Sequence, residues 1–468
     1  MDTVRINEKD NVCVDLSTGH KVALVDIPKG ENVIKYGYPI GYATENIRKG
    51  DGVHSHNMKT KLGEILSYEY KPNFETLQPE EPFFIDAFVR ENGDIGIRND
   101  IWIVPTVGCV NSVAKQLADK TGAICFSHPY GCSQLGDDMT VTQLVLRGLI
   151  KHPNAGGVLV LGLGCENNNI DEMKAVLGDY NAERIRFLCV QDCLNEFEEG
   201  EKIIESLKKT AEKDKRESVS VSRLKVGLKC GGSDGFSGIT ANPVVGLVTD
   251  KLCSMGASAI LTEVPEMFGA ETVLFERCVS KEIFDKGVDL INNFKQYFKN
   301  HGQPVSENPS PGNKEGGITT LEEKSLGCVQ KGGASPVVDV LDYGETVTKS
   351  GLNLLNGPGN DIVSITNLAA AGCHLVLFTT GRGTPLGGAV PTVKISSIDR
   401  VKDIAECCGW SGGKTEKDRK FLSDLKLLIT DYSDMPFMSI QQRVYRFQYG
   451  DPINKLLLID IREPNEIE

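Results

Sequence analysis

Thiol, hydroxyl and carboxylate side chains are concentrated between residues 224 and 269. Two short apolar runs in this stretch each end in polar residues, and glycines dominate the turn after the first run. Carboxylates can act as general acids and bases, whereas thiolates and carboxylates together can bind a divalent metal. The candidate side chains are Cys230, Ser233, Asp234, Glu263 and Glu266.

The elements around these residues read as strand, glycine-rich turn, helix and strand. Residues 224–228 and 257–261 are the apolar runs, and residues 241–255 between them have a helical pattern. This order is typical of a parallel sheet, in which ligands bind beyond the carboxyl ends of the strands. We therefore expect the candidate side chains to face one crevice, although such glycine-rich turns can also serve packing alone.

The same arrangement recurs further upstream in the chain. Apolar runs at residues 101–107, 123–127, 157–161 and 185–190 each lead into a turn with glycine, cysteine or other polar residues. This repetition predicts a sheet edge that is used for binding. The turns supply the candidates Cys109, His128, Cys132, Gln134, Cys165 and Glu166.

The N-terminal residues 1–70 read as a small β-rich domain. Apolar residues alternate over 12–16 and 20–24, and glycine-containing turns separate these segments. His54 and His56 close the domain, and on an extended strand residues i and i+2 point to the same face. Two imidazoles on one face would suit a metal or an anion, and a pair of exposed loop histidines is the alternative.

Two later segments could recognise a substrate. Residues 303–320 form a long polar loop with Asn313 and Lys314, which suit hydroxyl and carboxylate groups unless the loop is merely solvated. Arg382 lies in a glycine-rich turn after the apolar run 375–378. A guanidinium at a strand end is well placed to hold a carboxylate with two hydrogen bonds.

Composition and charge exclude several classes of protein. The net charge of -13 and the sequence pI ≈ 5.2 argue against a nucleic-acid partner, which requires a basic face. No apolar run is long enough to span a membrane, and residues 1–11 lack a signal-peptide pattern. We therefore expect a cytoplasmic protein with no membrane partner.

The 14 cysteines of the chain should stay reduced in the cytoplasm. They lack the paired CxxC spacing of a structural zinc site. Cys328 and Cys373 follow glycines at apparent strand ends, as the turn cysteines do. The thiols in turns are therefore available for catalysis or metal binding.

The chain divides at two polar segments. Residues 71–82 are rich in proline and acidic residues and read as a linker, whereas the charged segment 212–222 reads as a second boundary. We expect an α/β protein in which a small β-rich domain precedes two α/β domains with mainly parallel sheets. The expected domains are 1–70, 83–215 and 223–468.

Long motifs spread over the chain resemble a known family. They are GHKVALVDIPKGENVIKYGYPIGYA (19–43), VHSHN (53–57), PTVGCVN (105–111), HPYGCSQLGDD (128–138), GLGCENN (162–168), KCGGSDGFSGITANP (229–243), LTEVPEMFGAE (261–271), ENPSPGNKEGGITTLEEKSLGC (307–328) and FTTGRGTPLGG (378–388). Over roughly residues 5–397 the chain resembles the sugar-acid dehydratase family that includes altronate and galactarate dehydratases, with the altronate branch favoured. The first domain resembles the SAF-type module of that family.

The resemblance implies a hydro-lyase that converts D-altronate into 2-dehydro-3-deoxy-D-gluconate in hexuronate catabolism. It implies dependence on a divalent metal, with Fe2+ expected and Mn2+ as an alternative, and a homo-oligomer with a small sugar-acid ligand. Galactarate or a related sugar acid is the alternative substrate. From about residue 398 the sequence departs from the family pattern, which leaves open whether the last domain is complete.

Dehydration of a 2,3-dihydroxy acid requires a base for the C2 proton, a Lewis acid for the intermediate and an acid for the leaving C3 hydroxyl. Our hypothesis assigns acid–base roles to Glu263, Glu266, His128 and Asp234. It assigns substrate binding to Arg382, Lys314, Ser233, Asn313 and Gln134. It assigns the metal to ligands from among His54, His56, Cys109, Cys132, Cys165, Glu166 and Cys230.

Two other interpretations stay open. An iron–sulfur cluster on three of the turn cysteines is chemically feasible, although the cysteine spacing resembles no ferredoxin pattern. A sugar-acid-binding protein without catalysis is the alternative of a different class. A binder needs no reactive metal, so purified protein without metal would favour it.

Overall fold

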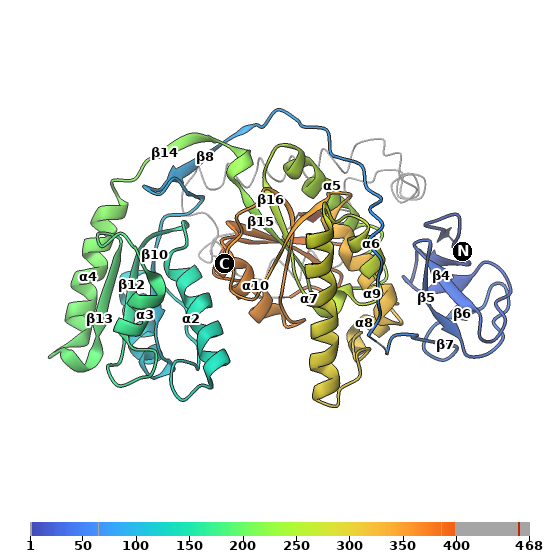
Figure 1. The fold of residues 1–468 in the computed structure, drawn as a ribbon, viewed down its shortest axis with the longest axis horizontal. Coiled ribbons are helices and arrows are strands. Elements are labelled where there is room, and N and C mark those ends of the chain that lie inside the picture. Colours follow the sequence, from blue (N-terminus) through green and yellow to red (C-terminus); the bar gives the residue numbers. More distant parts are fainter. Residues whose placement is uncertain (1, 64, 385, 398–456, 459–468) are drawn as a thin grey trace.

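The computed structural model describes residues 2–63, 65–384, 386–397 and 457–458. Figure 1 shows a small β-rich unit at one end of the molecule, a unit with a parallel sheet at the other end, and a large sheet between them. We call them the N-terminal, second and C-terminal units. The expected α/β class with a small β-rich beginning is confirmed. The divergent segment expected from about residue 398 lies, apart from residues 457–458, outside the described residues.

The N-terminal unit consists of two small antiparallel sheets, with strand orders β1-β2-β3-β6 and β4-β5-β7. Val33 and Ile40 are fully buried in one hydrophobic cluster with Val12, whereas Val14 belongs to a smaller cluster with Ile239 of the C-terminal unit. The period-2 pattern of the sequence therefore supplies the core of the unit. Its strands are β1 (Thr3–Val4), β2 (Val12–Asp15), β3 (Lys21–Ala23), β4 (Asn32–Lys35), β5 (Tyr38–Ala43), β6 (Gly52–Val53) and β7 (Met58–Lys59).

A three-stranded antiparallel sheet lies between the second and C-terminal units. In it β8 (Phe84–Val89) pairs with β9 (Ile95–Gly96) and with β14 (Arg216–Ser220). The segment 212–222, expected as a boundary, thus contains a strand that the sheet holds. Val219 is buried there, although the segment is polar overall.

The second unit has a four-stranded parallel sheet with the order β11-β10-β12-β13. Every residue of β12 is buried, as is typical of a parallel strand that helices cover on both faces. The strands are β10 (Asp100–Pro105), β11 (Ile124–Cys125), β12 (Ala155–Gly162) and β13 (Ile185–Cys189). The helices are η1 (Gly108–Val110), α1 (Asn111–Thr121), α2 (Gly136–Ile150), α3 (Ile170–Leu177), η2 (Val190–Asp192) and α4 (Glu196–Ala211).

The C-terminal unit is built on a seven-stranded sheet with the order β17-β18-β16-β15-β19-β20-β21. All neighbouring strands pair in parallel except β20 and β21. The strands are β15 (Lys225–Cys230), β16 (Ser258–Leu261), β17 (Val337–Leu341), β18 (Gly351–Leu355), β19 (Leu375–Thr380), β20 (Thr392–Ser396) and β21 (Leu457–Leu458). Because β15 is flanked by β16 and by the much later β19, the order of connection reverses beside it, where α/β sheets bind ligands.

The helices of the C-terminal unit include one in a segment that the sequence predicted as a loop. The loop expected over 303–320 contains a short helix that Ser310 and Asn313 cap reciprocally. The helices are η3 (Val221–Arg223), α5 (Ala241–Ser254), η4 (Val264–Met267), α6 (Glu271–Phe275), α7 (Lys281–Asn300), α8 (Pro311–Glu315), α9 (Leu321–Cys328), η5 (Val329–Gly332) and α10 (Asp361–Ala370).

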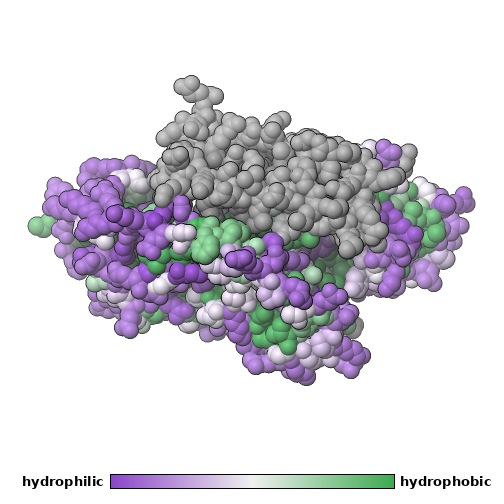
Figure 2. All heavy atoms as spheres, turned by 90° about the horizontal axis from the view of Figure 1, so that it is seen from above, coloured by the Kyte–Doolittle hydropathy of each residue, from purple (hydrophilic) through white to green (hydrophobic). Residues whose placement is uncertain are grey.

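The described surface carries both polar and apolar side chains. On the face in Figure 2, hydrophilic residues predominate at the two ends of the molecule, over the second unit and the N-terminal unit. Among the described residues, no helix combines the length and the apolar character needed to cross a membrane. The acidic balance of the whole chain, with a net charge of -13, accords with this polar exterior.

Candidate metal centre

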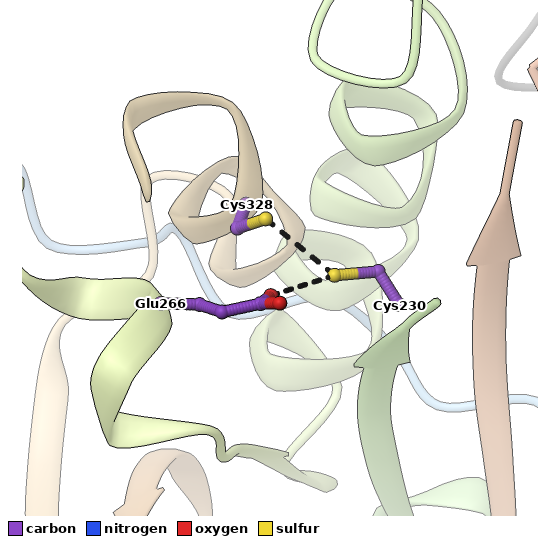
Figure 3. Close-up of side chains that lie close together, drawn as sticks. All are labelled: Cys230, Glu266 and Cys328. Carbon is purple, nitrogen blue, oxygen red and sulfur yellow. Dashed lines mark hydrogen bonds between the residues drawn. The ribbon is translucent and has the colours of Figure 1, made fainter. Parts of the chain in front are cut away.

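The carboxyl ends of β15 and β16 bring thiols and carboxylates together. Cys230 Sγ lies 2.9 Å from Glu266 Oε2 and 3.5 Å from Cys328 Sγ. Figure 3 shows the three side chains converging from the end of β15, from η4 and from the end of α9. We call these three residues the buried thiol site, because each is at most 5% exposed.

Local backbone geometry presents the two carboxylates to Cys230. Glu263 directly precedes η4 and has φ 71, a left-handed conformation that costs a non-glycine residue of order 1–3 kcal/mol. This turn places Glu263 Oε2 3.8 Å from Cys230 Sγ, while η4 carries Glu266 to its other side. The chain is therefore bent sharply at the end of β16 to aim both carboxylates at one thiol.

Lysine side chains surround the buried acidic groups. Lys331 Nζ lies 3.1 Å from Cys230 Sγ, and Lys324 Nζ lies 2.8 Å from Glu266 Oε1. Lys229 Nζ lies 2.6 Å from Glu263 Oε1. Buried carboxylates and thiolates are costly without a partner charge, so each of these anions has its own ammonium group.

A further carboxylate connects the cluster to the surface. Lys229 Nζ also lies 2.7 Å from Asp361 Oδ1, at the first residue of α10, and the Asp361 side chain is 37% exposed. Lys229 itself is fully buried. The lysine thus links the deepest carboxylate, Glu263, to a group that solvent can reach.

The charges in this cluster shift the pKa of each acid differently. The hydrogen bond from Cys328 lowers the pKa of Cys230 to about 6, and the same contact raises the pKa of Cys328. Burial opposes ionisation of Glu266, but three lysines, Lys324 first, outweigh it and lower its pKa. Burial and the nearby Glu266 raise the pKa of Glu263. The cluster therefore combines a thiol of lowered pKa, Cys230, and a carboxylate of lowered pKa, Glu266, with a more basic carboxylate, Glu263.

The donor set fits a divalent metal. Cys230, Glu266 and Cys328 are the one group among the described residues whose candidate ligand atoms all lie within 4.8 Å of one another. Two sulfurs and one carboxylate oxygen form a mixed set that iron or zinc accepts, and a thiolate is the form of cysteine that binds metals. This supports a metal cofactor at the site and leaves the identity of the metal open.

Ser233 and Asp234, expected beside Cys230, play different parts. Ser233 Oγ is buried without a hydrogen-bond partner among the described residues, and it lines a cavity of about 10 Å³ with Cys328 and Lys324. Asp234 Oδ1 instead accepts hydrogen bonds from the hydroxyls of Ser237 and Ser397. Ser233 therefore has a free polar group at the site, whereas Asp234 holds the surrounding turns together.

The N-terminal unit reaches the same region through two buried lysines. Lys21 Nζ and Lys35 Nζ lie 2.8 and 2.9 Å from opposite oxygens of Glu323, on the helix α9 that also carries Lys324 and Cys328. The two lysines lower the pKa of Glu323 to about 2 against the effect of burial. The small β-rich unit is therefore anchored to the helix that supplies the second thiol.

The histidines expected to bind metal lie away from an extended strand. His54 and His56 occupy the turn between β6 and β7, which the hydrogen bond from His54 N to Asn57 Oδ1 closes at 3.0 Å. The expectation that both point to one face of a strand is wrong. His54 Nε2 instead contacts the backbone oxygen of Lys314 at 2.9 Å, so it helps to join the N-terminal unit to α8.

Two of the expected substrate-binding residues, Asn313 and Arg382, lie in or beside α8, the helix before α9. Asn313 Nδ2 donates to the backbone oxygen of Ser233 at 2.8 Å, which ties α8 to the turn after β15. Arg382 pairs with Glu315 at 3.0 Å and has a side chain that is 40% exposed. Both residues lie on segments next to the buried thiol site, whereas Lys314 contacts His54 through its backbone oxygen.

The remaining candidates gather on the second unit, at the edge of a different sheet. Cys109, Cys132 and Cys165 are exposed there, outside the group formed by the buried thiol site. Glu166 accepts backbone hydrogen bonds from Leu163 and Gly164, which help to lower its pKa against the effect of burial. His128 and Gln134 hold the loop backbone, through Pro105 O and Gly131 N. The candidate metal ligands of the two units therefore form two separate sets and not the single site expected.

Sequence reasoning missed the lysines of the buried site and left its second thiol, Cys328, out of the named metal ligands. Lys229 and Cys328 belong to the motifs KCGGSDG and LEEKSLGC, but a lysine in a motif carries no signal of burial. Cys328 ends a helix rather than a strand, and Cys373 is buried just before β19, so neither lies at the strand end expected. A glycine before a cysteine does not by itself mark a strand end.

Comparison with known proteins places the chain in a family. It matches the altronate/galactarate dehydratase SAF domain over residues 2–61, the second domain of D-galactarate dehydratase/altronate hydrolase over 87–213, and the C-terminal domain of D-galactarate/altronate dehydratase over 221–407. It is 54% identical to altronate dehydratase of Bacillus subtilis, with 84% of this chain and 81% of the relative covered.

Two Escherichia coli proteins extend the comparison. The chain is 53% identical to altronate dehydratase, with 82% of this chain and 80% of the relative covered. It is 33% identical to galactarate dehydratase (L-threo-forming), with 81% of this chain and 77% of the relative covered. With this similarity over most of both lengths, the chain belongs to the altronate/galactarate dehydratase family.

Proposed function

We propose that this protein is a hydro-lyase that converts D-altronate into 2-dehydro-3-deoxy-D-gluconate in hexuronate catabolism. The relatives that are more than half identical are named altronate dehydratases, which favours altronate over galactarate. The observation that carries the proposal is the buried thiol site, where Cys230, Glu266 and Cys328 meet beside a basic carboxylate. A protein that only binds sugar acids would have no use for such a costly cluster of buried charges.

The metal ligands in this proposal are Cys230, Glu266 and Cys328. Fe2+, or Mn2+ as the alternative, would supply Lewis acidity that stabilises negative charge on the substrate carboxylate. Glu266 is assigned to the metal rather than to proton transfer, because its lysine contacts keep it ionised. A ligand must remain deprotonated throughout the reaction.

Glu263 is our candidate base for the proton at C2. Its raised pKa gives it the affinity for a proton that a general base needs, and Lys229 holds its carboxylate in place. The electron pair of the broken C2–H bond forms a C2–C3 double bond, and the C3–O bond breaks. The hydroxyl leaves as water after taking a proton, and the resulting enol becomes the 2-keto product.

Protonated lysines are our candidates for the acid. Lys324 and Lys331 keep their ammonium groups within hydrogen-bond distance of Glu266 and Cys230, and these contacts raise the pKa of both lysines. His128, the acid expected from the sequence, belongs to the second unit and is bonded there to Pro105. The candidate acids are therefore the two lysines that contact Glu266 and Cys230.

Substrate entry requires the covering segments to move. The cavity beside Ser233 and Cys328 has a volume of about 10 Å³, which suits one water molecule and not a six-carbon acid. Asn313 and the exposed Arg382 lie on the segments that cover it and are our candidates to hold the substrate carboxylate and hydroxyls. A bidentate guanidinium is suited to the carboxylate.

The decisive experiment measures 2-keto-3-deoxy acid formation from D-altronate under anaerobic conditions with Fe2+ and a thiol reductant. Product that disappears with a chelator and returns with Fe2+ supports the proposal, and Mn2+ in place of Fe2+ tests the metal. Galactarate in a parallel assay tests the alternative substrate. Altronate binding without turnover in metal-loaded, folded protein would instead favour the non-catalytic binder.

The cellular setting of this reaction is also a proposal. The buried thiol site needs reduced cysteines, which a reducing compartment such as the cytoplasm provides. Described cysteines form no disulfide with one another. We further propose a homo-oligomer, which size-exclusion chromatography with light scattering would establish.

A further inference from the structure

Three cysteines outside the buried thiol site lie on consecutive loops of the second unit. Cys109 is in η1 between β10 and α1, Cys132 lies between β11 and α2, and Cys165 lies between β12 and α3. Because β11, β10 and β12 are neighbours and pair in parallel, their following loops meet at one edge of the sheet. All three cysteines are free and exposed. We call these loops the cysteine loops.

Hydrogen bonds between the cysteine loops hold the residues next to each thiol together. Gly108 N donates to Tyr130 O at 2.9 Å, and Asn168 N donates to Gly131 O at 3.0 Å. Ser133 N donates to the side chain of a neighbouring-loop residue, Asn167, at 2.9 Å. The residues flanking Cys132 are therefore bonded to the other two loops, so the three thiols lie on loops that are joined to one another.

A glycine precedes each of the three cysteines and lets the loops approach closely. A Cβ at Gly131 would lie 2.2 Å from Thr106 O, and one at Gly108 would lie 2.9 Å from His128 O. Gly164 has φ +126, which side chains rarely adopt. Glycine is thus required at all three positions for the loops to stack as they do, and the cysteine that follows is placed at their surface.

The surroundings suit negatively charged sulfur. The helices α1, α2 and α3 begin shortly after the three cysteines, so the positive ends of their dipoles lie at this edge of the sheet. Gln191 Nε2 lies 3.6 Å from Cys165 Sγ and can donate to it. A thiolate is the form of cysteine that binds iron.

The separation of the thiols argues against a single shared ion. Their sulfurs do not form a group within 4.8 Å, a criterion that the buried thiol site alone meets among the described residues. One zinc ion with bonds of ~2.3 Å would hold its sulfurs within roughly 4.6 Å of one another. In an iron–sulfur cluster each thiolate binds a different iron, so the sulfurs lie farther apart.

We propose that Cys109, Cys132 and Cys165 bind a [4Fe–4S] cluster. The three thiolates would each bind one iron, and the fourth iron would take an oxygen ligand such as water or a carboxylate. Assembly of the [4Fe–4S]2+ state from two Fe2+, two Fe3+ and four sulfide ions needs no net electron transfer, and binding of the three thiolates releases three thiol protons. This site is additional to the metal of the proposed reaction and does not depend on the substrate of that reaction.

The test is a measurement of iron and acid-labile sulfide in the full-length protein, purified without oxygen and reconstituted with Fe2+, Fe3+ and sulfide. We expect about four sulfides per chain and a broad visible absorption band that a reductant bleaches. In Cys109→Ser, Cys132→Ser and Cys165→Ser the sulfide should fall at least about tenfold. Cys230→Ser and Cys253→Ser are the matched controls, and both should keep the full sulfide content.

Several results would overturn the cluster. They are reconstituted protein without labile sulfide, zinc or iron bound to the three thiols without sulfide, and a cluster that survives all three substitutions. Far-ultraviolet circular dichroism of each variant shows whether it is folded, and the exposed thiols make folding of the variants the expected outcome. Sulfide is counted without reference to turnover, so failure of the cluster and failure of the proposed reaction are distinguishable.

Discussion

Cys230 and Cys328 in the C-terminal unit are 1% and 3% exposed, whereas Cys109, Cys132 and Cys165 in the second unit are exposed. Cys230 ends a parallel strand and Cys328 ends a helix, whereas each exposed cysteine lies in a loop that follows a parallel strand. Cys230 has a lysine and a carboxylate as partners, whereas Cys132 and Cys165 contact the uncharged side chains of Ser133 and Gln191. Burial therefore dictates which side chains must accompany a thiol.

This difference separates the two kinds of metal site that the chain could hold. In the buried thiol site the ligand atoms already lie together, because each charge removed from water needs a partner nearby. The cysteine loops need no such pairing. Close approach of the loop backbones, which the glycines allow, holds their thiols in place instead. Substitutions in the buried thiol site should accordingly change both the chemistry and the stability of the protein. Substitutions in the cysteine loops should change metal binding without a comparable loss of stability.

The largest effect is expected for Cys230→Ser. Loss of this ligand should lower the kcat for altronate at least about 1000-fold and reduce the bound metal, because a hydroxyl is a poor substitute for a thiolate ligand. Steady-state kinetics and metal analysis would measure both. Cys253→Ser, at a half-buried cysteine of α5, is the matched control. Full activity of the Cys230 variant would remove this site from the mechanism.

Glu323→Gln should cause the largest loss of stability. It leaves Lys21 and Lys35 buried without their shared carboxylate, which typically costs about 3–5 kcal/mol. Glu315→Gln is the control, because the Glu315 side chain is 73% exposed and its pair with Arg382 should contribute less than about 1 kcal/mol. Denaturant unfolding measures the two. Equal effects would contradict the anchoring of the N-terminal unit through α9.

His152 at the contact between the units should make stability depend on pH. Burial lowers its pKa to about 3, helped by Lys225 and Arg90, and its Nε2 contacts Cys373 O at 3.1 Å. A depressed histidine pKa contributes stability above about pH 6.5, and this is lost as the pH falls, by about 1.4 kcal/mol per unit. The difference between the unfolding free energies at pH 7 and pH 5 should therefore be smaller in His152→Gln than in the unsubstituted protein. An unchanged difference would show that His152 does not contribute to the pH dependence of stability.

The smallest effect is expected for the stability of Cys165→Ser. Its thiol is exposed, so its free energy of unfolding without metal should stay within about 0.5 kcal/mol of the unsubstituted protein. Cys328→Ser, at a buried thiol, should lose roughly 1–3 kcal/mol under the same conditions. Denaturant titration of both apoproteins compares the two regions directly. A large loss in the Cys165 variant would show that the loop thiols serve packing.

Local sequence signals predicted the elements better than the site. The alternation in residues 12–16 and the buried run that became β12 are properties of single segments, so they could be interpreted without the fold. The pair of histidines in the turn after β6 was misjudged, because a spacing of two residues implies a shared face only if the backbone is extended. Lys331 was not recognised, because its contact with Cys230 spans 101 positions of sequence.

The sequence by itself determined the α/β class, the family and the turns in which chemistry-bearing residues lie. Glycines, cysteines and carboxylates after apolar runs are local features, and parallel strands bring their carboxyl ends to one edge. Only the tertiary structure decided which turns share a site. The order of strands puts Cys230 beside Glu266 and leaves Cys109 on another sheet, and the packing of α9 and η5 supplies Cys328 and the lysines. Strand order and helix packing depend on contacts between distant residues, which no local pattern specifies.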